Sequence, residues 1–423
     1  MNKKNQIIIW DQIGEPSYDQ NIILWNKRSN KFNSIINFID DNSRKIKNDV
    51  LDLLGNFGKS KIGNQDLINY YNIESNFSYW NLSFFVEKNF YKKNFFDILK
   101  ICALKIIVKK FKYKNIKIYT SNKNLIKFFQ NFCLKKKINL IVEFLDLKEK
   151  KKTNQTLKGF QRIIVFIFKR FNLKKNQIIK NNIFFSYFEN NDKDLKNSIY
   201  WSNLFEKINN KEIIQIFLPS KNYPNIRKIK NKNLNFLDYE FSIYLLIKIF
   251  FSFLKIKLLN KKVHKVANSV FVNDTINFWP IIKPYWEDSF TSINLFKNLY
   301  YYHLVKNIVL KKINNHKNLF YLLENQPWER CLCFFYKKKF KKQKLFGVSH
   351  TSIRFWDLRF FNSRNINLKN YSPNNICFFN KYSHNLYRAD FYNQKKIKLE
   401  SMRYKNVKIR FNLKKIVKEY EKN

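Results

Sequence analysis

The chain has 423 residues and a mass of 51.9 kDa, and its 81 lysines and arginines against 31 acidic residues give a formal net charge of +50. Hydrophobic residues make up 45% and aromatic residues 18% of the sequence, which excludes a disordered basic tail, because such tails lack the apolar surface needed to offset chain entropy. With only 6 glycines and 7 prolines, collagen-like and Pro/Gly-rich low-complexity classes are excluded too.

Alternating strand and helix patterns run along the chain. The expected strands lie at residues 7–10, 115–121, 138–146, 182–188, 212–220, 318–325, 344–350, 375–380 and 396–404. Helical patterns separate the paired strands, and the lysine-rich stretch 147–158 predicts a loop or boundary. This order predicts an α/β fold with Rossmann-like parallel sheets and helices on both faces. The expected regions are an N-terminal α/β region at 1–150, a middle one at 151–310 and a C-terminal one at 311–423.

The most apolar stretch covers residues 241–259. Lys248, Lys255 and Lys257 interrupt it, so no charge-free run approaches the ~18 residues of a membrane span. One interpretation is an amphipathic helix on a bilayer surface with its lysines at the headgroups. The other is a core helix whose lysines reach back to water. The N-terminus lacks a signal-peptide pattern, so we expect a cytoplasmic protein, peripheral on the inner face of the cytoplasmic membrane under the first interpretation.

The net charge also allows two interpretations. Lysine accompanies an excess of asparagine, isoleucine, phenylalanine and tyrosine, which is typical of compositional drift in an AT-rich genome. The alternative is a genuine attraction to an anionic surface, membrane or nucleotide. Nucleic acid is not an expected partner, because no RNP-like, KH-like or helix-turn-helix pattern accompanies the charge.

The five cysteines are odd in number and follow no zinc-site spacing; they are Cys102, Cys133, Cys331, Cys333 and Cys377. We expect buried free thiols and no metal site. P-loop, GxGxxG, GxSxG and HExxH patterns are also missing from the sequence, which disfavours kinase, dinucleotide-binding and protease functions.

Polar side chains gather at the ends of two neighbouring expected strands, over 324–330 and 347–359. The carboxyl ends of parallel strands meet at the edge where ligands bind. Glu324 can place a carboxylate in that crevice, His350 can transfer protons near neutral pH and Arg354 can clamp phosphate. Gly347 permits close backbone packing. Structural interpretations remain open for single residues: Glu329 and Arg330 as an exposed helix start, Trp328 and Trp356 as core, and His350 as a satisfied histidine.

The blocks ENQPWERCLCFFY at 324–336 and KLFGVSHTSIRFWDLRFFN at 344–362 resemble a bacterial family of surface carbohydrate biosynthesis proteins, found with O-antigen and capsule gene sets. Further blocks are similar to that family in the same order, so that the resemblance extends from about residue 70 to 405. These blocks are FSYWNLSFFVEKN at 77–89, FFSYFENN at 184–191, IYWSNL at 199–204 and LESMRY at 399–404.

That family resembles glycosyltransferases of the GT-B type, which have two facing Rossmann-like domains. The segment from Gly347 to His350 is similar to the Gly-x-x-His-Gly segment of capsule and teichoic-acid polymer transferases, with Thr351 in place of the second glycine. In those enzymes the histidine segment lies late in the first domain. The resemblance therefore implies a second domain that is short or incomplete, or a second chain that supplies the nucleotide-binding domain.

The implied function is transfer of a sugar from a nucleotide donor to a glycan or lipid-linked acceptor in O-antigen or capsule assembly. The alternative is a non-catalytic accessory protein that binds glycan or anionic membrane at the assembly site. We expect Glu324 or Glu329 as base and His350 as its proton partner. The expected substrate- and phosphate-binding residues are Asn325, Gln326, Trp328, Arg330, Ser349, Thr351, Ser352, Arg354, Trp356 and Arg403. No cofactor is expected beyond the donor substrate, and no metal, because no DxD-like strand end occurs in this block.

Overall fold

The computed structural model describes most of the chain. The described residues are 5–16, 21–74, 76–88, 95–144, 181–187, 198, 200–201, 207–209, 211–216, 234–314, 316–363, 366–387 and 394–399. Arg403 and the loop expected at 147–158 lie outside these ranges.

The N-terminal part of the chain forms a five-stranded parallel sheet. Its strands are β1 (Gln6–Trp10), β2 (Ile22–Leu24), β3 (Asn33–Ser34), β8 (Asn115–Thr120) and β9 (Asn139–Phe144), in the order β3-β2-β1-β8-β9. The helices around it are α1 (Ile35–Asp41), α2 (Ser43–Lys59), α5 (Phe95–Phe111) and α6 (Lys123–Lys136). Ser34 caps α1 and Asn122 caps α6 by accepting hydrogen bonds from the first backbone amides, which is why these helices begin there.

The second sheet has seven parallel strands. They are β10 (Asn182–Tyr187), β11 (Lys211–Ile216), β12 (Leu234–Phe236), β15 (Asn318–Leu322), β16 (Lys344–Val348), β17 (Asn375–Phe378) and β18 (Lys395–Lys398), in the order β12-β11-β10-β15-β16-β17-β18. Its long helices are α9 (Ile243–Val270), α10 (Trp279–Phe290), α11 (Ile293–Asn307), α12 (Pro327–Lys339) and the shorter α13 (Lys381–Leu386). The buried side chains of β10 are almost continuous along the strand, as expected for a parallel strand that helices cover on both faces.

Short elements complete the described fold. The small helices are α3 (Leu67–Tyr70), α4 (Phe84–Glu87), η2 (Tyr79–Leu82), η5 (Leu237–Glu240), η6 (Ile308–Lys312), η7 (Leu358–Phe360) and η8 (Lys369–Tyr371). Three antiparallel hairpins pair β4 (Lys61–Ile62) with β5 (Gln65–Asp66), β6 (Asn72–Glu74) with β7 (Phe77–Ser78), and β13 (Val272–Asn273) with β14 (Ile276–Asn277).

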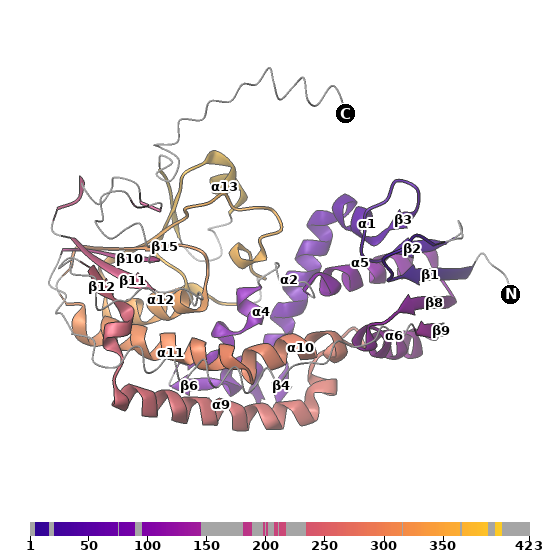
Figure 1. The fold of residues 1–423 in the computed structure, drawn as a ribbon, viewed down its shortest axis with the longest axis horizontal. Helices are drawn as coiled ribbons and strands as arrows, with labels where there is room; N and C mark the ends of the chain where they lie inside the picture. The colour runs from indigo at the N-terminus through magenta and orange to yellow at the C-terminus, as the bar shows by residue number, and fades with distance from the viewer. Residues whose placement is uncertain are drawn as a thin grey trace, which may run out of the picture.

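Both parallel sheets have the doubly wound arrangement. In each, the first strand lies inside the sheet, the second and third follow on one side, and the fourth and later strands follow on the other. The two sheets lie at opposite ends of the molecule, with α9, α10 and α11 along one side (Figure 1). β1 starts at the N-terminus, at the outer end of its sheet, and runs inward toward the middle. The carboxyl edge of the first sheet therefore faces the rest of the chain.

Tertiary contacts also turn the carboxyl edge of the second sheet toward the N-terminal part. The segment that follows β16 reaches α2, where Lys47 Nζ donates to the Phe355 carbonyl at 2.7 Å and Ser363 Oγ donates to Asp52 at 2.7 Å. Lys47 Nζ also lies 3.0 Å from the centre of the Phe361 ring. Burial lowers the pKa of Lys47 to about 7, and the charge of Asp357 opposes that change.

An aromatic core joins the two parts. Phe57 of α2 packs edge-on against Phe85 and Phe271, and Trp286 of α10 packs on Trp80 and Phe271. Each of these rings is almost fully buried. The two sheets therefore share one hydrophobic core.

The structure confirms the predicted parallel α/β architecture, and a described strand overlaps each predicted strand. The five cysteines are free and buried, as predicted. Two expectations differ. β10 pairs with β15, so the expected boundary at residue 310 does not separate two sheets. The sheet that carries His350 comes second and is the larger, so the second domain is not short. The resemblance implied that the histidine segment lies late in the first domain. In the structure, residues 6–144 already form the first sheet, and His350 follows a strand of the second.

A substitution at Gly347 tests how closely the second sheet is packed. A Cβ at this position would lie 3.0 Å from Pro373 Cγ and 3.1 Å from Tyr321 Oη, whereas a Cβ at Gly14 would have nothing within 4 Å. We expect Gly347→Ala to lower the free energy of unfolding by about 1–3 kcal/mol because of overpacking. Gly14→Ala should leave it within about 1 kcal/mol of the parent. Urea unfolding measures both, and equal stability of the two variants would contradict this packing.

Candidate functional site

The candidate site lies at the carboxyl edge of the second sheet, beside its centre. Chain order reverses between β10 and β15, and in open parallel sheets ligands bind outside the carboxyl ends at such a reversal. β15 pairs with β16 so that Leu322 stands opposite Val348. Glu324 and His350 each follow two residues beyond that pair. The register of the sheet therefore brings two segments distant in sequence together.

Glu324 and His350 lie in contact at this edge and form an ion pair when the imidazole is protonated. His350 Nε2 lies 3.1 Å from Glu324 Oε1, with the His350 side chain 4% and the Glu324 side chain 25% exposed. Tyr187, at the end of β10, donates through its hydroxyl to Glu324 Oε2 at 3.5 Å. The Tyr200 ring packs edge-on against the imidazole, with ring centres 4.9 Å apart. The predicted pair is thus brought together.

Burial alone would raise the pKa of Glu324, but its neighbours reverse that effect. The hydrogen bond and charge of His350, the charge of Arg359 and a hydrogen bond from Gln326 together hold the pKa below its ordinary value. Glu324 is therefore a carboxylate at neutral pH. An ionised carboxylate that is only partly exposed is suited to accept a proton or to orient a sugar hydroxyl.

The other imidazole nitrogen of His350 makes no hydrogen bond within the described residues. Nδ1 is buried, whereas Nε2 contacts the Glu324 carboxylate. A buried polar atom without a partner costs free energy, and such atoms call for a functional or structural explanation. Glu324 thus fixes one nitrogen of the ring and leaves the other for a further interaction.

Glu329 has a different role from the one expected. It is the third residue of α12, is 2% exposed, and its two carboxylate oxygens accept the backbone N–H groups of Glu324, Asn325 and Gln326 at 2.8–3.1 Å. Asn325 has a φ of +57°, the left-handed conformation that asparagine tolerates best after glycine. Glu329 holds this turn, and the turn positions Glu324.

The surroundings of Glu329 also oppose a role as base. Burial raises its pKa to about 8, and the hydrogen bonds from the three backbone amides work against that rise. Because both oxygens accept N–H groups, the geometry suits an ionised carboxylate that is fully engaged with the backbone. The expectation of Glu329 as a catalytic base is therefore not supported by its position, and Glu324 is the carboxylate that faces His350.

Of the two arginines expected as anion clamps, Arg330 is engaged elsewhere. Arg330 is 3% exposed and donates from its guanidinium to the Val86 carbonyl at 3.1 Å, at the contact between α12 and α4. Lys88 lies close to it, since the charge of Arg330 adds to burial in lowering the pKa of Lys88. Arg354 is exposed in the loop after β16.

Arg359 is the arginine whose charge acts on Glu324. It forms a two-point ion pair with Asp357, Nε to Oδ1 at 2.8 Å and the terminal nitrogen to Oδ2 at 2.7 Å. Asp357 and Glu324 both raise the pKa of Arg359 against the effect of burial. Asp357 also faces Lys47 of α2, so the charged network of the site extends to the N-terminal part.

The other expected residues are partly structural. Trp328 is 3% exposed, and its indole N–H donates to the Tyr187 hydroxyl at 3.3 Å. Ser349 Oγ donates to the Thr351 carbonyl, and Ser352 Oγ accepts from Asn380. Trp356 is half-buried and packs edge-on against Phe355.

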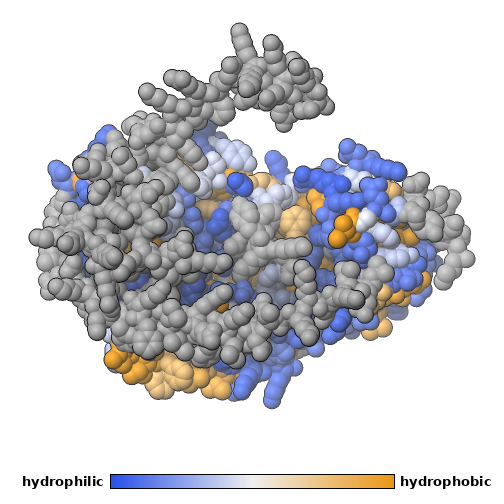
Figure 2. Space-filling model, viewed as in Figure 1, coloured by the Kyte–Doolittle hydropathy of each residue, from blue (hydrophilic) through white to orange (hydrophobic). Residues whose placement is uncertain are grey.

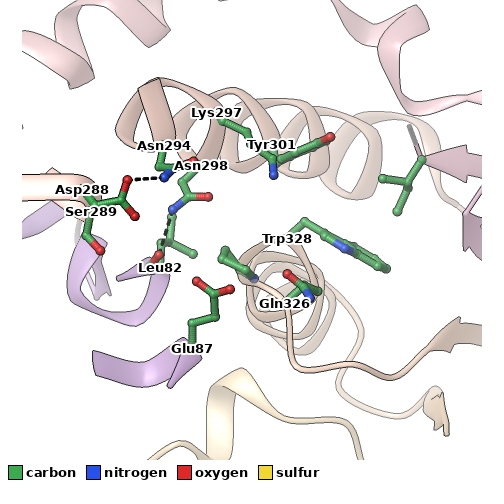
Figure 3. A pocket seen from close by; sticks show the side chains of 12 residues that line it. Leu82, Glu87, Asp288, Ser289, Asn294, Lys297, Asn298, Tyr301, Gln326 and Trp328 are labelled. Carbon is green, nitrogen blue, oxygen red and sulfur yellow. Dashed lines mark hydrogen bonds between the residues drawn. The ribbon is translucent and has the colours of Figure 1, made fainter. Parts of the chain in front are cut away.

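A cavity of about 260 Å³ opens beside the turn that joins β15 to α12. It is lined by Leu82, Glu87, Ile216, Asp288, Ser289, Asn294, Lys297, Asn298, Tyr301, Gln326, Pro327 and Trp328. Figure 3 shows the side chains of α11 on one side, Gln326 and Trp328 on the other, and Glu87 at the lower end. Gln326 connects the cavity to the ion pair, because its side chain also hydrogen-bonds to Glu324. Carboxylates, amides and a lysine around a small space suit a polyhydroxylated ligand such as a sugar.

Within the described residues, no group of three or more His, Cys, Asp or Glu side chains is placed to hold a metal ion. The sequence reasoning missed Tyr187, Tyr200 and Asp357. Tyr187 lies in a predicted strand that turns out to neighbour β15, and it falls within the FFSYFENN block at 184–191; both were signals for it. Tyr200 and Asp357 lie in connections, whose course depends on tertiary packing.

We expect Glu329→Ala to lower the free energy of unfolding by about 2–4 kcal/mol, because three buried backbone N–H groups lose their acceptor. Glu329→Gln should also destabilise, since its amide nitrogen must face an N–H group. Urea unfolding measures the loss, with Glu15→Ala as control because the Glu15 side chain is 63% exposed. A loss no larger than that of the control would contradict the role of Glu329 in the turn.

The ion pair predicts a pH-dependent stability. The folded pKa of Glu324 lies below its unfolded value of about 4.3, so the carboxylate stabilises the fold above that pH, and this is lost as the pH falls through the folded pKa. Glu324→Gln should therefore lower the free energy of unfolding by about 1–3 kcal/mol near neutral pH, with the gap closing in acid. Unfolding curves across pH measure it, with the exposed Glu287→Gln as control. A gap independent of pH would refute the ion pair.

Three comparisons with known proteins are negative. No family model, no curated protein and no solved structure gives a significant match to this chain.

Proposed function

We propose that the chain is a glycosyltransferase-like protein of cell-surface polysaccharide biosynthesis, which transfers a sugar from a nucleotide donor to a glycan or lipid-linked acceptor. The observation that carries the proposal is the Glu324–His350 pair at the carboxyl edge of one parallel sheet, turned toward a second parallel sheet of the same chain. The resemblance of the 324–336 and 344–362 blocks to surface carbohydrate biosynthesis proteins supports the same assignment.

Glycosyl transfer needs a base for the acceptor hydroxyl and positive charge for the leaving phosphate. Glu324 is the proposed base, because its pKa is held low and its carboxylate is partly exposed. His350 is the proposed partner that orients this carboxylate or donates a hydrogen bond to the leaving group. Arg359 is proposed as a further cation of the site, because its charge acts on Glu324. Arg354 stays a proposed phosphate contact, because it is exposed in the loop after β16.

The donor is proposed to bind across the carboxyl ends of β10, β15 and β16, where nucleotides bind in open parallel sheets. The cavity beside Gln326 is the proposed place for a sugar ring. The described chain itself contains two parallel sheets, so the proposal does not require a second chain. The substrate itself would supply the nucleotide, so no cofactor enters the scheme.

Purified protein should release nucleotide from at least one member of a panel of nucleotide sugars that includes a CMP-linked acidic sugar. We expect His350→Ala and Glu324→Gln to lower kcat/KM by about 10²–10⁴, the usual contribution of a positioned acid or base. His264→Ala is the matched control, because its side chain is 44% exposed on α9.

Two outcomes would change the assignment. Unchanged turnover in His350→Ala would exclude this pair as the catalytic group. Donor or glycan binding by calorimetry without any turnover would favour the alternative, a non-catalytic accessory protein at the assembly site.

A further inference from the structure

Helix α9 is the longest helix of the described residues, with 28 residues and a length of about 42 Å at 1.5 Å per residue. One face packs against the core through side chains that are at most 6% exposed, namely Leu245, Ile249, Ile256, Val263, Ala267 and Val270. Buried Asn260 on this face accepts hydrogen bonds from Tyr71 and Trp286. α9 is therefore fixed to the molecule by one side only.

The opposite side of α9 is apolar as well, and it is exposed. Seven large apolar side chains on this side are 39–65% exposed: Ile243, Tyr244, Ile247, Phe250, Phe251, Leu254 and Leu258. At 3.6 residues per turn they fall within an arc of about 120°, so they form one continuous stripe. We call these seven residues the α9 stripe. Figure 2 shows it as a hydrophobic patch along the lower edge of the molecule, beside a hydrophilic surface.

Lysines border the α9 stripe. Around the helix, Lys257 lies just outside one edge of the arc, and Lys248 and Lys255 lie just outside the other. Further lysines follow Leu258 toward the end of the helix. The exposed lysines of α9 are Lys248, Lys255, Lys257, Lys261, Lys262 and Lys265. No aspartate or glutamate occurs between residues 243 and 270. The surface therefore combines a ridge of apolar side chains with positive charge of a single sign.

We propose that α9 docks the protein on an anionic lipid bilayer, with the α9 stripe in the headgroup and acyl boundary and its lysines at the lipid phosphates. A helix that lies in the interface has this distribution of apolar and cationic side chains. Charge complementarity selects the bilayer over a second copy of this chain, because two such faces would bring their lysines together. No helix of the described residues is long and apolar enough to cross the bilayer.

Docking by α9 would hold the candidate site close to the lipid surface. α11 packs against α9 and also lines the cavity through Asn294, Lys297, Asn298 and Tyr301. One layer of helix therefore separates the docked face from the cavity. The docking proposal rests on α9 alone and does not depend on the proposed function.

Sedimentation of the full chain with vesicles tests the proposal. We expect binding to vesicles of phosphatidylcholine with phosphatidylglycerol, and much weaker binding to phosphatidylcholine alone. The variant Ile247→Gln, Phe251→Gln, Leu258→Gln should bind the anionic vesicles roughly 100-fold less, because the apolar area that would leave water is removed. Glutamine keeps the helix propensity of the segment.

A matched control removes three exposed apolar side chains elsewhere. Ile13→Gln, Phe111→Gln, Leu134→Gln lies in the N-terminal part, at side chains that are 54–97% exposed, and should bind as the parent does. Urea unfolding of each variant shows that the fold is kept.

A second pair of variants tests the charge. Lys248→Gln, Lys257→Gln, Lys261→Gln should weaken binding to anionic vesicles on the order of 100-fold. Lys109→Gln, Lys110→Gln, Lys135→Gln removes the same charge from exposed positions on α5 and α6 and should have little effect.

Three results would overturn the proposal. One is failure of the parent protein to sediment with the anionic vesicles. Another is equal binding by the α9 and control variants. The third is a concentration-dependent dimer, measured by light scattering, that the Ile247, Phe251 and Leu258 changes abolish, because the α9 stripe would then belong to a second copy.

Discussion

The candidate site depends on one interaction, the acceptance of three backbone N–H groups by the buried carboxylate of Glu329. The chain must turn from the end of β15 into α12 within four residues, and Asn325 takes a left-handed conformation to do so. Such a turn leaves amide groups that no strand or helix can satisfy, and the two carboxyl oxygens of Glu329 accept all three. With the turn fixed, Glu324 lies where the parallel register has also placed His350.

The division of labour between the two glutamates follows from this arrangement. They are five residues apart, yet Glu329 is fully buried against the backbone while Glu324 remains partly exposed beside a histidine. Burial raises the pKa of one, and ionic neighbours lower the pKa of the other. Opposite environments for two carboxylates are the usual way in which a site separates a structural or acidic group from a base.

The sequence allowed the strands, the parallel sheets and the meeting of the 324 and 350 segments to be predicted, because each depends on local pattern or on a general rule for parallel strands. Close packing at Gly347 was also predicted, because glycine has no Cβ to oppose it, and Pro373 and Tyr321 lie against this position. The role of Glu329 could not be predicted, because a helix-start glutamate has the same spacing whether it faces water or backbone. The direction of Arg330 toward Val86 depends on α4, which is more than 240 residues away in the chain.

The cationic side chains discussed above fall into two groups by their position in the fold. Lys47, Lys88 and Arg330 are buried, and carbonyls, amide oxygens or aromatic rings hold them at the contact between the two sheets. These cations are structural, because their donors point into the protein. The lysines of α9 are exposed instead, beside apolar side chains that nothing in the described chain covers. Compositional drift explains a lysine-rich surface, but it does not explain why an exposed apolar stripe runs between lysines over a helix that has no acidic residue.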